Sequence, residues 1–211
     1  MTLVRRKERS TFMKQTVVWA SAAIMVMVVV LAGYWIVVSL RKDAEARVMI
    51  APEVVAGYVH AVIEANRTIY ATGVVEKMQE HGIVQAAEHW KQENALPLPA
   101  QFLIETGRLV AEKGSGLKYK LVSLWPIYVW NGPATDFERK GLEAVIKNPG
   151  EPYTGFVRLG RERYFQAIYP DRAVAQACVN CHNNHANSPK RDFKLNDVMG
   201  GIVITIPVNP Q

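Results

Sequence analysis

Both cysteines of this 211-residue chain lie in one five-residue motif, Cys178-Val179-Asn180-Cys181-His182. A C-x-x-C-H motif is typical of the attachment site of a c-type haem, in which each thiol adds to a vinyl group and the histidine binds the iron. The spacing lets both sulfurs reach one edge of the porphyrin while the next residue lies beneath the metal. The motif therefore predicts one covalently attached haem c, held by Cys178, Cys181 and His182 as the proximal ligand.

Three other kinds of site use closely spaced cysteines. A zinc site would need Cys178, Cys181 and two further ligands such as His182 and His185, but the usual C-x2-C…H-x3-5-H spacing is absent. A thioredoxin-type dithiol begins a helix after a strand, whereas this motif is expected to follow a short helix and enter an Asn-rich loop. A disulfide between residues three apart would be strained. Haem attachment is the favoured interpretation.

The other side of the iron would take a second ligand or stay open to water or a small molecule. The residues with suitable side chains are His60, His81, His89, His185, Met49, Met78 and Met199. His60 shares a helical face with Arg67, so a helix over the haem would present His60 to the iron and Arg67 to a propionate. The alternative is that His60 is a half-buried packing residue.

A basic N-terminus precedes a long uncharged stretch. Residues 1–15 hold five basic side chains and one acidic one, and residues 16–40 hold no charge. These 25 residues exceed the roughly 20 that a helix needs to cross a bilayer. They also exceed the apolar part of a cleaved signal peptide, about 7–15 residues. Because the basic residues come first, we expect a single-pass protein of the bacterial inner membrane, with residues 1–15 cytoplasmic and residues 41–211 periplasmic.

The remaining composition excludes several classes of protein. Hydrophobic residues make up 49% of the chain and charged residues only 21%, which excludes a disordered polyampholyte. Much of the net charge of +6 belongs to the N-terminal tail, because residues 41–211 hold 20 basic and 18 acidic side chains. This distribution argues against a nucleic-acid-binding face.

Residues 41–211 are expected to form one α+β domain. Its long N-terminal helix, over 43–82 with Pro52 near the start, would be continuous with the transmembrane helix. Further helices are expected over 83–94, 99–114, 172–178 and 135–148, the last opened by a capping box of Thr135 and Glu138. Strands are expected over 118–130, 153–159, 163–169 and 198–208. Such an order is typical of a PAS-like antiparallel sheet with flanking helices.

Seven blocks of this domain resemble a family of PAS-like c-type-haem sensor domains, found on the outer side of bacterial chemoreceptors and sensor kinases. The blocks are residues 66–70, 96–102, 121–128, 136–138, 163–171, 177–183 and 188–202. The resemblance implies that haem redox state or a bound diatomic ligand is sensed, and that Arg67 and Tyr70 form a distal pocket pair. In some members a further cysteine binds the distal side of the iron. This sequence has no third cysteine for that role.

Two roles follow for the domain, neither of them enzymatic. The first is a redox or diatomic-ligand sensor module that signals to a partner protein. The second is a tethered monohaem electron carrier beside a membrane redox complex, which the absence of an output region after the last strand favours. Acid and base groups of a peroxidase are not singled out by the sequence. A homodimer through the long N-terminal helix is a further expectation.

Overall fold

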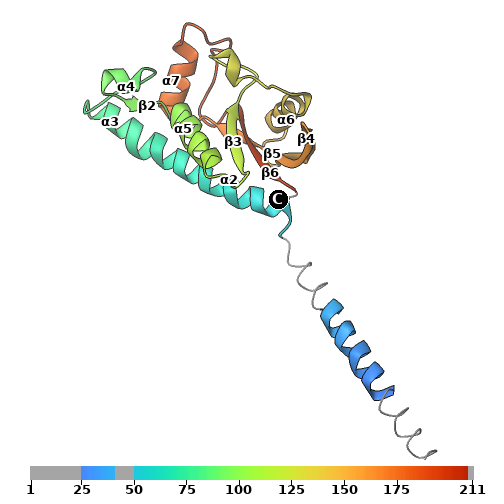
Figure 1. The fold of residues 1–211 in the computed structure, drawn as a ribbon. Coiled ribbons are helices and arrows are strands. Elements are labelled where there is room, and N and C mark those ends of the chain that lie inside the picture. The colour runs from blue at the N-terminus through green and yellow to red at the C-terminus, as the bar shows by residue number, and fades with distance from the viewer. Residues whose placement is uncertain (1–24, 41–49, 209–211) are drawn as a thin grey trace, which may run out of the picture. The chain divides into compact units, whose positions relative to one another are not determined.

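The computed structural model describes residues 25–40 and 50–208, which divide into two compact units. The first contains a helix over residues 25–40, and the second, from Ala51, contains every element labelled in Figure 1. Within these described ranges, no helix combines the length and the apolar character that crossing a membrane requires. Residues 1–15 and the first nine residues of the predicted span, 16–24, lie outside the described part.

A long helical run opens the second unit. It consists of α2 (Pro52–Thr68), the π-helix η1 (Ile69–Glu76) and α3 (Lys77–Glu80). It ends before Gly82, whose φ is +64°, which glycine adopts at little cost. The predicted helix is thus confirmed from Pro52, but its continuity with an upstream helix is wrong, because Ile50 and Ala51 are not helical. Ala51 has ψ of 137°, as expected for a residue before proline.

The next segment differs from its prediction. A helix was expected over 83–94, but the structure has β1 (Ala86–Ala87), the one-turn α4 (Trp90–Glu93) and β2 (Leu96–Pro97), with β1 and β2 pairing in parallel. Helices of this length are marginal without tertiary packing, and the backbone here bonds across the segment instead, from Leu96 N to Gln85 O at 2.9 Å. The following helix, α5 (Pro99–Glu112), confirms the prediction over 99–114.

Four strands form one antiparallel sheet in the order β3-β6-β5-β4. The strands are β3 (Lys118–Val122), β4 (Tyr153–Leu159), β5 (Glu162–Arg172) and β6 (Val198–Pro207).

The helix α6 (Asp136–Lys147) begins as predicted, with Thr135 Oγ1 accepting a hydrogen bond from Glu138 N. The strand expected over 118–130 stops at Val122, because Ser123 N bonds Asn131 O and the chain turns into the 3-10 helix η2 (Val129–Asn131). The α+β class, an antiparallel sheet with flanking helices, is confirmed.

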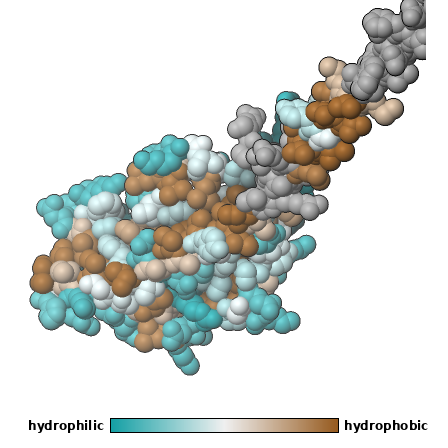
Figure 2. Space-filling model, turned by 90° about the horizontal axis from the view of Figure 1, so that it is seen from below, coloured by the Kyte–Doolittle hydropathy of each residue, from teal (hydrophilic) through white to brown (hydrophobic). Residues whose placement is uncertain are grey.

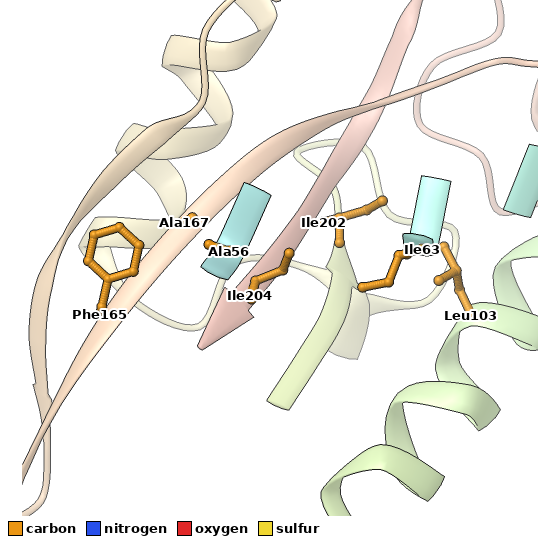
Figure 3. Packing of buried hydrophobic residues seen from close by; sticks show 7 residues of the cluster. All are labelled: Ala56, Ile63, Leu103, Phe165, Ala167, Ile202 and Ile204. Atoms are coloured by element: carbon orange, nitrogen blue, oxygen red, sulfur yellow. The ribbon is translucent and has the colours of Figure 1, made fainter. Parts of the chain in front are cut away.

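Helices cover both faces of this sheet. On one face, α2 and α5 pack against alternate residues of β5 and β6 (Figure 3). On the other face, Leu142 and Val145 of α6 pack against Ile168 and Val203. Because side chains alternate between the faces of a strand, consecutive residues of β6 are all buried. At Gly141 of α6 an added Cβ would lie 2.3 Å from Ile168 Cδ1, so glycine allows this helix to approach the sheet closely.

The helix α7 (Gln176–Asn184) carries the complete C-x-x-C-H motif. The expected helix over 172–178, followed by a loop that holds the motif, is therefore wrong. Residues 172–175 are not helical, because β5 extends to Arg172 and Ala173 N donates to Asp197 O at 2.9 Å. Below α7, Val179 is buried in a small cluster with Ala173, Phe193 and Met199, which fixes the helix to the end of the sheet.

Candidate functional site

A cavity of about 960 Å³ lies in the second unit. Its walls come from α7, the α2–α3 run, α5, the end of β3 and the segments around residues 86–90 and 126–131. This volume is at the upper end of the roughly 300–1,000 Å³ typical of small-molecule and cofactor sites. Elements far apart in the sequence therefore meet around one cofactor-sized space.

The helix α7 directs the motif into this cavity. Cys178, Cys181 and His182 all line it, because residues three and four apart share one face of a helix. Val179, between them, faces the buried cluster. Both cysteines are free thiols. The structure thus brings together the three residues predicted for haem attachment, and the described residues contain no group of three or more His, Cys, Asp or Glu arranged to hold a metal ion.

His182 is a neutral imidazole in this setting. Burial, together with the smaller effects of the Arg67 and His185 charges, lowers its pKa to about 4. Its Nδ1 atom is buried without a hydrogen-bond partner, and its ring meets Phe193 edge to face at 5.8 Å. A neutral imidazole has the lone pair that metal binding requires. The residue is therefore held in a form that can bind iron at neutral pH.

Arg67 also lines the cavity, where it is fixed by Asp171 at the end of β5. Its Nε lies 2.9 Å from Asp171 Oδ1, its Nη2 donates to Oδ2 at 3.1 Å, and its Nη1 donates to Arg172 O at 3.3 Å. Both charged side chains are about 7% exposed. Arg67 is the only Arg or Lys among the described cavity-lining residues, so the predicted position of Arg67 beside the cofactor is compatible with the structure.

Tyr70 and His60 lie elsewhere and do not line the cavity. Tyr70 donates a hydrogen bond to Pro97 O at 2.7 Å and stacks on Phe102. His60 stacks on Tyr169 with ring centroids 3.9 Å apart, and its Nε2 is buried without a partner. The predicted distal roles of these two residues are not supported by their placement.

Two of the other candidate second ligands do line the cavity. His89 is exposed, and Met199 is buried in the cluster below α7. His81, His185 and Met78 are outside the lining, and Met49 lies outside the described residues.

A hydrogen-bonded group at the cavity wall was missed by the sequence analysis. Glu88 Oε1 lies 2.8 Å from His185 Nε2, and Tyr128 donates its hydroxyl to Glu88 Oε2 at 2.5 Å. The hydrogen bond to this carboxylate raises the pKa of Tyr128 to about 12. The group ties the segment before α4, the loop after β3 and the C-terminus of α7 together. No local pattern marks residues so far apart in the chain.

The N-terminus of α7 is bonded to the long helical run. Glu76, the last residue of η1, accepts a hydrogen bond from Gln176 N at 3.1 Å. The first N–H groups of a helix have no partner within it, and a carboxylate also suits the positive end of the helix dipole. Glu76 thus caps the helix that carries the motif, a contact that spans 100 residues of sequence.

The chain is similar to a known family and to a solved structure. The model of the Tll0287-like family matches residues 41–207. The crystal structure of the cyanobacterial haem protein Tll0287 is similar at 14% sequence identity with a TM-score of 0.49, covering 77% of this chain and 99% of that chain. No curated protein matches the sequence.

Proposed function

Because the chain belongs to the Tll0287-like family, a membership that confirms the resemblance predicted from its sequence blocks, we propose that its globular domain binds one haem c covalently. A single observation carries this proposal: Cys178, Cys181 and His182 face one cavity of about 960 Å³ from a single helix. The residues fit the cofactor in kind as well as in place, since both thiols are free and a neutral imidazole nitrogen lacks a protein partner.

Each residue of the motif would have a distinct role. The sulfur of Cys178, and likewise that of Cys181, would bond to a vinyl carbon while the thiol hydrogen passes to the neighbouring carbon. His182 would bind the iron as the proximal ligand. Arg67, kept in place by Asp171, would offer a positive charge to a propionate. When bound, the haem supplies an iron that can change redox state or bind a diatomic ligand.

We assign this site to sensing rather than to catalysis. The helix that carries the haem-binding residues is capped by Glu76 of η1, and Arg67 of α2 lies in the same cavity. A change of charge or ligand at the iron would therefore act on two points of one helical run. A π-helical stretch within a long helix is also frequent at functional sites, and here it makes the contact with α7. These observations support a redox or diatomic-ligand sensor module.

Anchoring in the bacterial inner membrane, with the domain in the periplasm, is part of the same proposal. It is supported by the 25 uncharged residues 16–40 and the five basic residues before them. Covalent haem attachment is an extracytoplasmic process, so the motif favours the same orientation. The haem domain would then report to a signalling partner in or beside the membrane.

Electron transfer is the second candidate, and one observation favours it. Trp130 lines the cavity yet is 74% exposed, and the neighbouring Val129 is 84% exposed. Trp130 stacks on Tyr128 at 5.0 Å. Exposed apolar groups beside a redox cofactor would suit the small, transient interfaces of electron-transfer partners.

The attachment is tested with the full chain produced alongside a cytochrome c maturation system. Wild type should retain haem after denaturing electrophoresis, and the variant Cys178→Ala with Cys181→Ala should retain none. The exposed His81 provides a control, since His81→Ala should keep the haem. Persistent haem staining in the double-cysteine variant would contradict covalent attachment at this motif.

The two roles are separated by spectra and by amide hydrogen exchange. A sensor should show altered exchange in residues 69–76 between the oxidised and reduced protein, or on addition of carbon monoxide to the reduced protein. An electron carrier should be low-spin in both states, insensitive to carbon monoxide and unchanged in exchange. Glu76→Ala should weaken any change in residues 69–76, because it removes their hydrogen bond to α7.

A further inference from the structure

The side of α2 that faces away from the sheet is apolar. Val54, Tyr58 and Val62 of α2 are 43%, 66% and 61% exposed, and Ile69, the first residue of η1, is 67% exposed. Two exposed alanines complete this surface, which we call the outer face: Val54, Tyr58, Ala61, Val62, Ala65 and Ile69. Neighbouring members are three or four residues apart, so they form one continuous stripe along the helix. Figure 2 views the molecule from the side on which α2 lies in Figure 1 and shows apolar side chains there among polar ones.

This stripe cannot be explained by the domain's own core. The opposite side of the same helix supplies the buried residues Ala56, Ile63 and Arg67. A surface helix ordinarily carries polar side chains on the side away from its core. Contiguous apolar surface of this kind marks an interaction site.

The charges next to the stripe restrict the kind of partner. No member of the outer face is charged, and the exposed charged residues of α2, Glu53 and Glu64, are both acidic. Helices that lie on a bilayer surface typically carry Lys and Arg on their polar side. In α2 the one Arg or Lys is Arg67, which is buried against Asp171. These charges disfavour an anionic lipid surface and leave an uncharged protein surface as the better fit.

We propose that the outer face pairs in parallel with the same face of a second copy of this chain. A two-fold interface sets one surface against itself, and the stripe suits this because Ala61 and Ala65 leave room for Tyr58 and Val62 of the other copy. From Val54 to Ile69 the seam would be about 24 Å long, at 1.5 Å per residue. The inference goes beyond the proposed function, because the pairing does not require the haem.

The chain itself offers a reason for parallel orientation and for association. The uncharged residues 16–40 end 12 residues before α2 begins at Pro52. In two copies anchored through this segment, both chains would run from the anchor into α2 in the same direction, which favours a parallel pair. Anchoring would also raise their local concentration. A modest seam would then be sufficient for a stable pair.

Cysteine cross-linking of the full chain in mild detergent tests the pairing. Ala61→Cys and Ala65→Cys should form covalent dimers with a short bis-maleimide at least fivefold more than the control Glu143→Cys, which is exposed on α6. Cross-linking of the wild type measures the background that Cys178 and Cys181 contribute. Equal cross-linking at all positions would overturn the proposal.

A second variant provides an independent measurement. Tyr58→Lys with Val62→Lys should change the mass in analytical ultracentrifugation from dimer to monomer, with haem content and near-ultraviolet circular dichroism unchanged because both side chains are exposed. A wild-type monomer would contradict the proposal. A second contradicting result would be that Ala61→Cys does not cross-link, while a fluorophore attached to it reports immersion in lipid vesicles. That result would identify the bilayer as the occupant of the outer face. Haem content distinguishes failure of the dimer from failure of the proposed function.

Discussion

His60 and Arg67 share one helix but not one site. Seven residues bring them to nearly the same angle around the helix, yet they are about 10 Å apart along its axis. Arg67 therefore reaches the cavity, whereas His60 stacks on Tyr169 beside the core. Helical spacing correctly groups residues by face, but it does not give the position of the cofactor along the helix. The sequence therefore leaves the other side of the iron unassigned between a second ligand and an open site.

The burial of His60 has a consequence for the pH dependence of folding. Burial lowers its pKa, and the nearby Glu64 opposes this shift. In the unfolded chain a histidine titrates near pH 6.5, so below this value the unfolded state takes up a proton more readily than the folded state. The contribution of His60 to stability is therefore fully present above pH 6.5 and is lost as the pH falls towards the lower folded-state pKa.

Replacing His60 with phenylalanine should remove this dependence. His60→Phe keeps an aromatic ring on Tyr169 but cannot be protonated. The free energy of unfolding in urea, compared at about pH 7.5 and about pH 5.5, should fall less for His60→Phe than for wild type. His81 is exposed, so His81→Gln should behave as wild type. An equal fall in wild type and His60→Phe would show that His60 is not protonated preferentially on unfolding.

At the scale of elements, the connection between η1 and α7 depends on one carboxylate. Glu76 accepts from the first N–H of the helix that carries Cys178, Cys181 and His182. Glu76→Ala should lower the free energy of unfolding by about 1 kcal/mol, the usual cost of losing a helix cap. Glu80, one turn further on, has no hydrogen bond to α7, and Glu80→Ala should change stability by less than about 0.5 kcal/mol. Urea unfolding of both variants measures the difference, and equal values would contradict the capping role.

The elements that the sequence predicted correctly are those with strong local signals. Helix α6 has its capping threonine, and β4 and β5 flank the turn at Gly160, whose φ is +66°. The errors occur where a contact outside the predicted element decides the structure. Residues 172–175 pair with the chain near Asp197 instead of beginning a helix, and Ser123 bonds Asn131 instead of extending β3. Asp197 lies outside the window of roughly 11–18 residues on which such predictions depend. Asn131 is near Ser123 in the sequence, but the bond between them closes a loop, which apolar periodicity does not predict.

The candidate site likewise contains residues that a local pattern predicts and residues that only the fold brings together. The motif residues and Arg67, which were predicted from residue types and spacing, line one cavity in the structure; the C-x-x-C-H motif is a local sequence pattern and can therefore be recognised without the fold. The group of Glu88, Tyr128 and His185 and the cap from Glu76 join residues 40 to 100 positions apart in the sequence, in pairs that only the fold creates. Tyr70 was assigned through family resemblance, but its hydroxyl bonds Pro97 O. It also stacks on Phe102 and does not line the cavity, so its distal role stays a prediction from the resemblance alone.

At the scale of the whole molecule, the proposed signal depends on where the chain is held. Residues 16–40 contain no charge, and the five basic residues before them oppose translocation of the N-terminus. The full chain should therefore stay in the membrane fraction after an alkaline carbonate wash. Replacing residues 1–40 with a cleavable export signal should give a soluble periplasmic protein that still carries haem. In intact spheroplasts, external protease should degrade the haem domain of the full chain but not a tag placed before Met1. Full-length protein in the soluble fraction, or a tag cleaved from outside, would contradict the anchoring and its orientation, and signalling by the haem would then need a route other than this segment.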